Sequence, residues 1–350
     1  MQRKDQSAAG NPPLARPQPA ASVSVGDPMP RITLPLASGS LFDSWDPMTS
    51  GLARAYWLGT PPAAPAAAQL TETLAACETL LHIVATAPPA VPGDYPSWLL
   101  DRAGELGRAF GATGPLVIIV DTAGRVAAVL PAPTLDGVAA LATRLYVAST
   151  PAVVQAKAPV LLLERVAEPA LCQTLIEYWQ RGDKLANEVG STGGNVVNAD
   201  VKRRFDVQLD DPKLFVHLRD CLVRRVVPAM TQAFHARINV IEAPRIGCYD
   251  ATSGGWFRRH RDNTSSFNAH RQFALSLNLN GDDEYDGGEL RFPEFGRELY
   301  RPVAGGALVF SSSLLHEVIP VTRGRRFGVF TFLSASGPSV SAKPPAGPRY

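Results

Sequence analysis

Between residues 245 and 333 the chain is a succession of short apolar runs separated by Gly, Asn, Asp and Pro. The runs RIGCYD, FALSLNLN and GGALVF are each about as long as one strand, and the residues between them favour turns. Many short strands with frequent turns are typical of closed or sandwiched antiparallel sheets. The pattern therefore predicts a β-sandwich or jelly roll for this part of the chain.

Two histidines, one aspartate and one arginine stand out within this stretch. His260 and Asp262 form an H-x-D pair, His316 follows after a further run of strands, and Arg326 lies ten positions beyond it. Two imidazoles and one carboxylate make up the facial triad that binds non-haem Fe(II) and leaves coordination positions open for oxygen chemistry. The planar guanidinium group of an arginine suits a co-substrate that carries a carboxylate.

An H-x-D triplet alone is a weak signal, because a surface turn with a salt bridge has the same sequence. The residues around it strengthen the interpretation. Tyr249 lies on the run that leads into His260, and an acidic, Gly-rich turn at Asp282–Gly288 precedes the second histidine. Because alternate residues of a strand face opposite sides, we expect Arg326 to face the site and Arg325 to face away from it.

The earlier part of the chain alternates apolar runs with helical patterns. We expect strands at Ala53–Leu58, Leu80–Ala85, Pro115–Val120 and Arg125–Leu130, and helices at Ala66–Cys77, Trp98–Phe110 and Leu135–Tyr146. Strands separated by helices, ending in a hairpin and a last helix, indicate an open α/β sandwich.

A second domain is expected to begin with the apolar strand Val160–Leu163. Amphipathic helices are predicted at Glu168–Arg181 and Pro212–Phe234, where apolar residues recur at helical spacing. His217 falls on the second of these helices and is interpreted as a surface or packing residue. The segment Leu185–Asp206 is rich in Gly, Asn and Ser, so we expect a mobile loop there.

Changes in composition suggest the domain boundaries. Residues 1–22 and 335–350 are rich in Pro, Ala, Ser and Gly without an apolar pattern, so we expect both to be disordered. We assign residues 23–148 to the first domain and residues 160–334 to the second. The small and polar residues 149–159 are expected to be a linker.

Composition excludes several classes of protein. The chain of 350 residues is 45% apolar and 19% charged, and its formal net charge of +2 indicates neither a nucleic-acid nor a membrane partner. The sequence has no apolar segment long enough to span a bilayer and no signal-peptide pattern near its start, so we expect a cytoplasmic protein. The four cysteines are far apart without a C-x-x-C pair, which predicts buried free thiols. They are Cys77, Cys172, Cys221 and Cys248.

The first domain resembles the thioredoxin-like fold, in its peroxiredoxin branch. The matching residues are G-D-P-M-P at Gly26–Pro30 and T-P-P-A at Thr60–Ala63. Peroxiredoxins carry their reactive cysteine at the position of Ala63, so the resemblance implies the fold without the peroxidase activity. Thioredoxin-like proteins commonly have a cis-proline at the strand that corresponds to Pro115–Val120. We accordingly expect the Gly114–Pro115 bond to be cis. We expect this domain to serve docking or the pairing of two chains in a homodimer.

The second domain resembles the 2-oxoglutarate- and Fe(II)-dependent dioxygenases, in their prolyl 4-hydroxylase-like branch. Three motifs carry the resemblance: Y-x(10)-H-x-D from Tyr249 to Asp262, D-x-G-G-E-L-x-F-P at Asp286–Pro293, and H-E-V-x-P-V-x-x-G-x-R from His316 to Arg326. The implied fold is a double-stranded β-helix, or jelly roll, with flanking helices. It would follow an α/β thioredoxin-like domain in this chain.

The same resemblance implies the roles of individual residues. His260, Asp262 and His316 would bind iron, and Arg326 and Tyr249 would bind the distal carboxylate of 2-oxoglutarate. The implied cofactors are Fe(II), 2-oxoglutarate and O₂, together with the ascorbate that this branch uses. The expected reaction is the hydroxylation of an unactivated C–H bond.

The substrate stays open at this level. A prolyl or other residue of a peptide or protein is favoured by the branch, and a free amino acid or small metabolite is the alternative. A thiol-dependent peroxide or redox protein is the competing class, and Ala63 at the cysteine position argues against it. Nucleic acid is not expected as a substrate. The nucleic-acid demethylases built on similar barrels have an additional arginine six positions after the first, and this chain lacks it.

Overall fold

A computed structural model describes residues 22–336, except 48–49, 92, 94, 96, 147–152, 155, 187 and 192–193. The described residues fall into two compact units, one within residues 18–152 and the other within residues 153–350. This division lies inside the segment that was predicted to be a linker. The predicted disordered ends lie outside the described residues, apart from Ser22, Ala335 and Ser336.

The first unit is built around a mixed sheet of five strands in the order β5-β4-β3-β6-β7. Strands β3, β4 and β5 are mutually parallel, whereas β6 is antiparallel to β3 and β7 is antiparallel to β6. The strands are β3 (Ala53–Leu58), β4 (Thr79–Ala85), β5 (Trp98–Leu100), β6 (Leu116–Val120) and β7 (Val126–Pro131). A separate hairpin, β1 (Thr33–Pro35) and β2 (Leu41–Asp43), precedes them.

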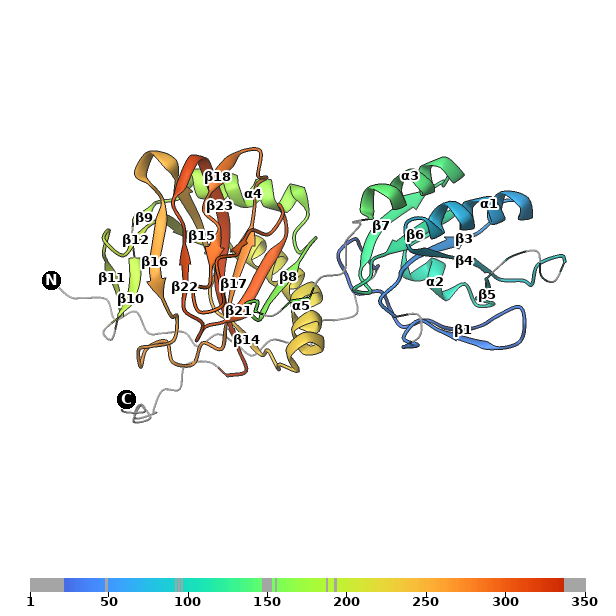
Figure 1. Ribbon diagram of the computed structural model, residues 1–350, viewed down its shortest axis with the longest axis horizontal. Helices are drawn as coiled ribbons and strands as arrows, with labels where there is room; N and C mark the ends of the chain where they lie inside the picture. The colour runs from blue at the N-terminus through green and yellow to red at the C-terminus, as the bar shows by residue number, and fades with distance from the viewer. Residues whose placement is uncertain are drawn as a thin grey trace. The chain divides into compact units, whose positions relative to one another are not determined.

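Helices cover both faces of this sheet (Figure 1). The helices are α1 (Ala64–Ala75), α2 (Glu105–Ala109) and α3 (Leu135–Leu145). Trp57 and its face of the sheet pack with α1 and α3, whereas Tyr56, the preceding residue of β3, packs on the α2 side. The alternation of side chains along β3 therefore produces two apolar layers from one buried strand.

Most elements of the first unit match the sequence-based prediction to within two residues, but one does not. The predicted helix Trp98–Phe110 begins instead with strand β5, which pairs in parallel with β4, and only Glu105–Ala109 is helical. The buried carboxylate of Asp101 accepts hydrogen bonds from the amides of Glu105 and Leu106. It thus caps the short helix immediately after the strand ends.

The prediction of a cis bond before Pro115 was wrong, because all peptide bonds among the described residues are trans. Ala63 immediately precedes α1, which agrees with its predicted position before a helix. The four cysteines are free and buried, as predicted.

The second unit contains two facing sheets. The larger has strands in the order β8-β21-β17-β23-β15-β13-β9, with β14 and β18 pairing to β23, and the smaller has the order β12-β16-β22-β19-β20. Its strands are β8 (Val160–Leu163), β9 (Leu185–Ala186), β12 (Lys202–Arg203), β13 (Phe205–Gln208), β14 (Val240–Ile241), β15 (Arg245–Asp250), β16 (Trp256–His260), β17 (Phe273–Asn278), β18 (Tyr285–Gly287), β19 (Leu290–Arg291), β20 (Leu299–Tyr300), β21 (Ala307–Ser311), β22 (His316–Val318) and β23 (Val321–Ser334). All described pairings in both sheets are antiparallel.

Two apolar clusters lie on opposite sides of the larger sheet. Helices α4 (Pro169–Arg181) and α5 (Pro212–Phe234) cover its outer face, where Leu175 and Leu218 are fully buried. Phe292 and Phe310 belong to the second cluster, between the two sheets. This is the predicted jelly-roll arrangement with flanking helices, and both helices match their predicted ranges.

The segment Leu185–Asp206 is not the loop that was predicted. It contains short strands, including the antiparallel hairpin β10 (Glu188–Ser191) and β11 (Gly194–Val197). Strand β12 then joins the smaller sheet beside β16, and β13 joins the larger sheet beside β15. Pairing with the two sheets satisfies the backbone hydrogen bonds of this segment, and its polar sequence gave no indication of that pairing.

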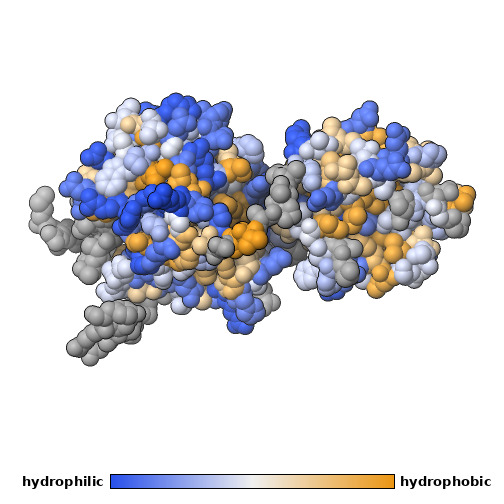
Figure 2. Space-filling model, viewed as in Figure 1, coloured by the Kyte–Doolittle hydropathy of each residue, from blue (hydrophilic) through white to orange (hydrophobic). Residues whose placement is uncertain are grey.

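Within the described residues, no helix is long and apolar enough to cross a membrane. Hydrophilic and hydrophobic side chains are interspersed over the visible face of each unit (Figure 2).

Candidate metal centre and carboxylate pocket

Strand pairing brings the two predicted histidines together. His260 is the last residue of β16 and His316 is the first residue of β22, and the two are register partners in the smaller sheet. Asp262 follows β16, where its amide donates a hydrogen bond to the carbonyl of Ser312 at 2.9 Å. Antiparallel pairing therefore joins residues that are far apart in the chain.

The three side chains converge through their ligand atoms. Nε2 of His260 lies 3.3 Å from Oδ1 of Asp262, and Nε2 of His316 lies 3.5 Å from Oδ2 of Asp262. Metal bonds of about 2.0–2.2 Å place neighbouring ligand atoms about 3.0–3.5 Å apart. The spacing of this trio is thus the spacing that a metal ion requires, and the three residues form one of two such groups among the described residues.

Both imidazoles are held in the tautomer that binds metal. Nδ1 of His260 lies 2.7 Å from the carbonyl oxygen of Arg258, and Nδ1 of His316 lies 3.0 Å from that of Leu314. A carbonyl oxygen can only accept, so each Nδ1 carries the proton and each Nε2 presents its lone pair. The backbone has therefore already oriented both rings toward Asp262.

Burial and charge favour the metal-binding protonation states of His316 and Asp262. Burial lowers the pKa of His316 to about 4, so this ring is neutral at physiological pH. Burial alone would raise the pKa of Asp262, but the neighbouring His316 and His260 outweigh it and lower the pKa below its usual range. A neutral imidazole and an ionised carboxylate are the forms that ligate a divalent ion.

Aromatic rings form the wall of the site. The ring of Phe257 stacks on His260 with 3.7 Å between centroids, and Phe310 meets His316 edge-on at 4.6 Å. Phe292 lies 6.1 Å from His316 and is almost completely buried. These apolar neighbours restrict water on the inner side of the trio and fix both imidazoles by packing.

Arg326 lies on β23 in the interior of the same unit, only 1% exposed. Its guanidinium donates to the carbonyl of Gly288 at 2.6 Å, to Oγ of Ser276 at 3.0 Å and to Oδ1 of Asn278 at 3.4 Å. All three acceptors are neutral, and no carboxylate of the described residues forms an ion pair with it. A buried cation without an anion is costly, so this site favours an anionic ligand.

Tyr249 is fully buried beside Arg326. The guanidinium carbon of Arg326 lies 5.7 Å from the centre of the Tyr249 ring. Its hydroxyl lies 3.3 Å from Nη1 of Arg204, which donates to it. Burial is the main cause that raises the pKa of Tyr249, so the phenol stays protonated and can donate its own hydrogen.

Three buried charged residues, of which Arg204 contacts Tyr249, were missed by the sequence analysis. Arg204 pairs with the carboxylate of Asp206 through Nε and Nη2, and Lys202 donates to the same carboxylate at 2.7 Å. Burial lowers the pKa of Lys202 to about 8. The K-x-R-x-D alternation places all three on one face, and it could have signalled a strand within the presumed loop.

Three residues close to the site have other contacts. Arg325 is exposed and pairs with Asp250 at 2.7 Å, so the predicted register of β23 is confirmed. Asn278 is buried but serves the framework, since its amide donates to the carbonyls of Asn280 and Pro302. Arg261, between His260 and Asp262 in the chain, turns outward to Glu294.

Comparisons with known proteins place this geometry in context. A family model described as the 2OG-Fe(II) oxygenase superfamily matches residues 245–334. A PKHD-type hydroxylase of Teredinibacter turnerae is 31% identical over 187 residues, which are 51% of this chain and 80% of that protein. A PKHD-type hydroxylase of Acidovorax ebreus is 30% identical over 160 residues, which are 44% of this chain and 69% of that protein.

Among solved structures, the chain is similar to a prolyl hydroxylase from Trichoplax adhaerens in complex with a peptide fragment of the hypoxia inducible factor oxygen degradation domain. The identity is 17% and the TM-score is 0.43, and the match covers 51% of this chain and 84% of that chain.

Proposed function

The chain belongs to the PKHD-type hydroxylases of the 2OG-Fe(II) oxygenase superfamily, and on that premise we propose that it hydroxylates prolyl residues of a peptide or protein. It is a 2-oxoglutarate-dependent dioxygenase, and its reaction requires Fe(II), 2-oxoglutarate and O₂. Ascorbate is a further cofactor of this type of enzyme. The assignment of residues to these ligands and the identity of the substrate are our proposals.

Fe(II) is held by His260, Asp262 and His316 in this proposal. The observation that carries it is the convergence of both Nε2 atoms on the two oxygens of Asp262, with each Nδ1 proton held by a backbone carbonyl. One carboxylate and two neutral imidazoles suit non-haem Fe(II) and leave room for further ligands. When bound, the iron and 2-oxoglutarate supply the oxidising power that inserts one oxygen atom of O₂ into a substrate C–H bond.

Arg326 binds the distal carboxylate of 2-oxoglutarate in the same proposal. Its charge has only neutral partners within the described part of the protein, so a carboxylate would complete the pairing. Ser276 and Tyr249 supply hydroxyl groups beside it. The cation and hydroxyls orient the co-substrate, while the aromatic wall around the histidines excludes water from the reacting end.

A peptide is proposed as substrate because of the edge next to the metal ligands. Strand β12 is the outer strand of the smaller sheet and pairs with β16, which ends at His260. The hairpin β10–β11 comes just before β12 in the chain. In Figure 1 it lies close to β12 and β16. An extended peptide can bind along such an edge through main-chain hydrogen bonds, with one side chain directed to the metal.

The metal assignment is tested with His316→Ala and Asp262→Ala. Each variant is expected to lose Fe(II) binding, measured on the purified protein, and to lose the succinate that forms from 2-oxoglutarate in the absence of substrate. Arg261→Ala, between the ligands but turned outward, is the matched control and should retain both. Unchanged iron content in either ligand variant would contradict the assignment.

The substrate is tested by stimulation of succinate release. Proline-containing peptide pools are expected to stimulate turnover, with a gain of one oxygen atom in the peptide by mass spectrometry. Stimulation by free amino acids or small metabolites alone would support the alternative substrate class and overturn the peptide proposal.

The first unit has a thioredoxin-like fold in our proposal. Support comes from the order β4-β3-β6-β7, in which the first two strands are parallel and the next two antiparallel, with α1 between β3 and β4. Ala63 stands immediately before α1 in place of a thiolate. The unit then serves docking or the pairing of two chains.

A further inference from the structure

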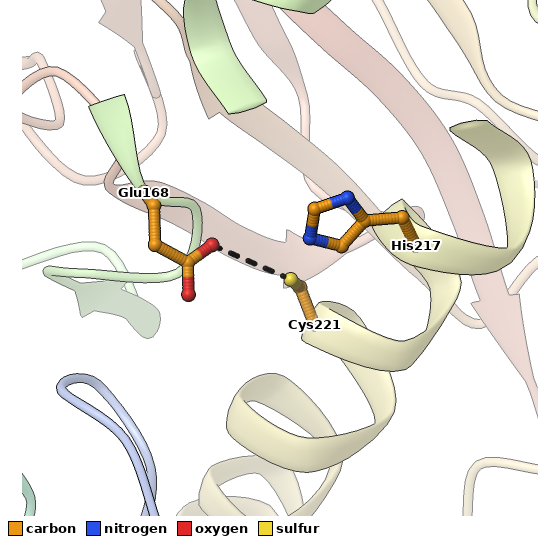
Figure 3. A group of neighbouring side chains, drawn as sticks. All are labelled: Glu168, His217 and Cys221. Atoms are coloured by element: carbon orange, nitrogen blue, oxygen red, sulfur yellow. Dashed lines mark hydrogen bonds between the residues drawn. The ribbon is translucent and has the colours of Figure 1, made fainter. Parts of the chain in front are cut away.

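A second group of potential metal ligands lies outside the site described above. It consists of Glu168, His217 and Cys221, whose ligand atoms all lie within 4.8 Å of one another (Figure 3). Glu168 lies between β8 and α4, at the β8 edge of the larger sheet, whereas the two other residues are on α5. The trio around Asp262 belongs instead to the smaller sheet.

Helix geometry places two of the three ligands side by side. His217 and Cys221 are four residues apart on α5, so their side chains project from the same face one turn apart. In Figure 3 both point toward Glu168. The imidazole is exposed and the thiol is buried, so the group is reachable from solvent on the histidine side.

Glu168 is oriented as a ligand and not as a helix cap. It is the residue that precedes α4, yet its side chain makes no capping hydrogen bond. One carboxylate oxygen, Oε1, instead pairs with Arg225, whose guanidinium is buried and also donates to the carbonyl of Val166 at 2.9 Å. The other oxygen, Oε2, lies 3.8 Å from Sγ of Cys221.

As in known metal sites, this arrangement has a set of candidate ligands and a further residue that holds one of them in place. Arg225 holds one oxygen of the carboxylate, as the hydrogen-bonding partners of metal ligands commonly do. The second oxygen is left directed at the thiol. Bonds of about 2.3 Å to sulfur and about 2.0 Å to oxygen place these atoms about 3.5 Å apart in a tetrahedral site. The observed separation of 3.8 Å is close to that value.

We propose that Glu168, His217 and Cys221 bind a zinc ion, with water as the fourth ligand on the exposed side. One thiolate, one imidazole and one carboxylate are ligands that Zn²⁺ accepts in a tetrahedral site. The sulfur ligand disfavours Mg²⁺ and Ca²⁺, which prefer oxygen. The ion joins the start of α4 to α5 and thereby ties together the two helices that cover the larger sheet.

Binding displaces the thiol proton of Cys221 to solvent. Burial raises the pKa of this thiol to about 11, so the group is a neutral thiol before the ion arrives. The metal–sulfur bond forms as the sulfur–hydrogen bond breaks, with no change in oxidation state.

The test uses the full chain carrying His316→Ala, so that the other trio no longer competes for the ion. Co²⁺ is added as a spectroscopic substitute for zinc, and the near-ultraviolet charge-transfer band between thiolate and cobalt is recorded. Zn²⁺ is then titrated against a chromophoric chelator. We expect the band to appear with Co²⁺ and to disappear when Zn²⁺ displaces it.

Variants assign the band to this group. Cys221→Ser should abolish it, and His217→Gln should weaken zinc binding by more than about 100-fold, beyond the usual effect of an outer partner. Cys172→Ser is the matched control, because this buried cysteine on α4 lies outside the group. It should leave both the band and the affinity unchanged.

His217 is exposed, so its variant should fold even if Cys221→Ser does not. Absence of the band in the parent chain, its persistence in Cys221→Ser, or unchanged zinc affinity in His217→Gln would each overturn the proposal. These outcomes are independent of hydroxylase activity, because the parent chain already lacks a catalytic ligand.

Discussion

Replacing Arg326 by alanine tests the co-substrate pocket directly. The guanidinium is 1% exposed and its three acceptors are neutral, so the carboxylate of 2-oxoglutarate would be its charged partner in a dry site. Losing a buried, hydrogen-bonded charge pair costs about 2–5 kcal/mol. At 1.4 kcal/mol for each tenfold change, the KM for 2-oxoglutarate should rise by about 30-fold or more.

Arg325→Ala is the control on the same strand. Its side chain is 57% exposed and pairs at the surface with Asp250, an interaction that is worth about 0–1 kcal/mol at most. The assay is succinate formation as a function of 2-oxoglutarate concentration, with thermal unfolding to verify that both variants fold. Equal KM values in the parent and Arg326→Ala, or a larger effect of Arg325→Ala, would refute the reasoning.

Three further predictions concern other parts of the chain. Burial, with Arg54 nearby, lowers the pKa of His82 to about 4, so the unfolded chain binds the proton first and stability should fall from pH 6.5 toward 4 by about 3 kcal/mol. His82→Gln should flatten that part of the unfolding profile, and an unchanged profile would contradict the assignment. Gly288→Ala should cost about 1–2 kcal/mol of stability and raise the KM for 2-oxoglutarate, because φ is +74° and the new Cβ would lie 3.0 Å from Cδ of Arg326. Thiol-dependent peroxide reduction should be absent, and robust turnover that disappears in Cys77→Ser would show that the first unit is a working redox enzyme.

Sequence periodicity predicted much of the architecture because it reports local burial. Helix α5 matches its predicted range, and strands β3 and β8 match theirs. The segment that begins at Trp98 was misread because its apolar spacing also fits a helix, whereas pairing with β4 makes its first three residues a strand. Such pairing depends on a partner that lies elsewhere in the chain, and local pattern cannot report it.

The candidate site divides in the same way. The sequence alone singled out His260, Asp262 and His316 as the proposed iron ligands, and the inward direction of Arg326 followed from strand alternation. The buried charges that accompany Tyr249, with Arg204 foremost, emerged only from tertiary structure, since Gly, Asn and Ser nearby suggested a loop.

The second metal group makes the same distinction most clearly. The spacing of His217 and Cys221 is visible in the sequence. However, an i, i+4 pair on an amphipathic helix does not predict a metal site unless a third ligand is known to lie beside it. Glu168 lies about fifty residues earlier, before another helix, and its carboxylate is turned by the buried Arg225. Sequence determines which side chains a helix or strand presents on each face, because that depends on the local backbone repeat. Only the packing of elements against one another decides which faces meet, because that depends on the burial of the whole unit.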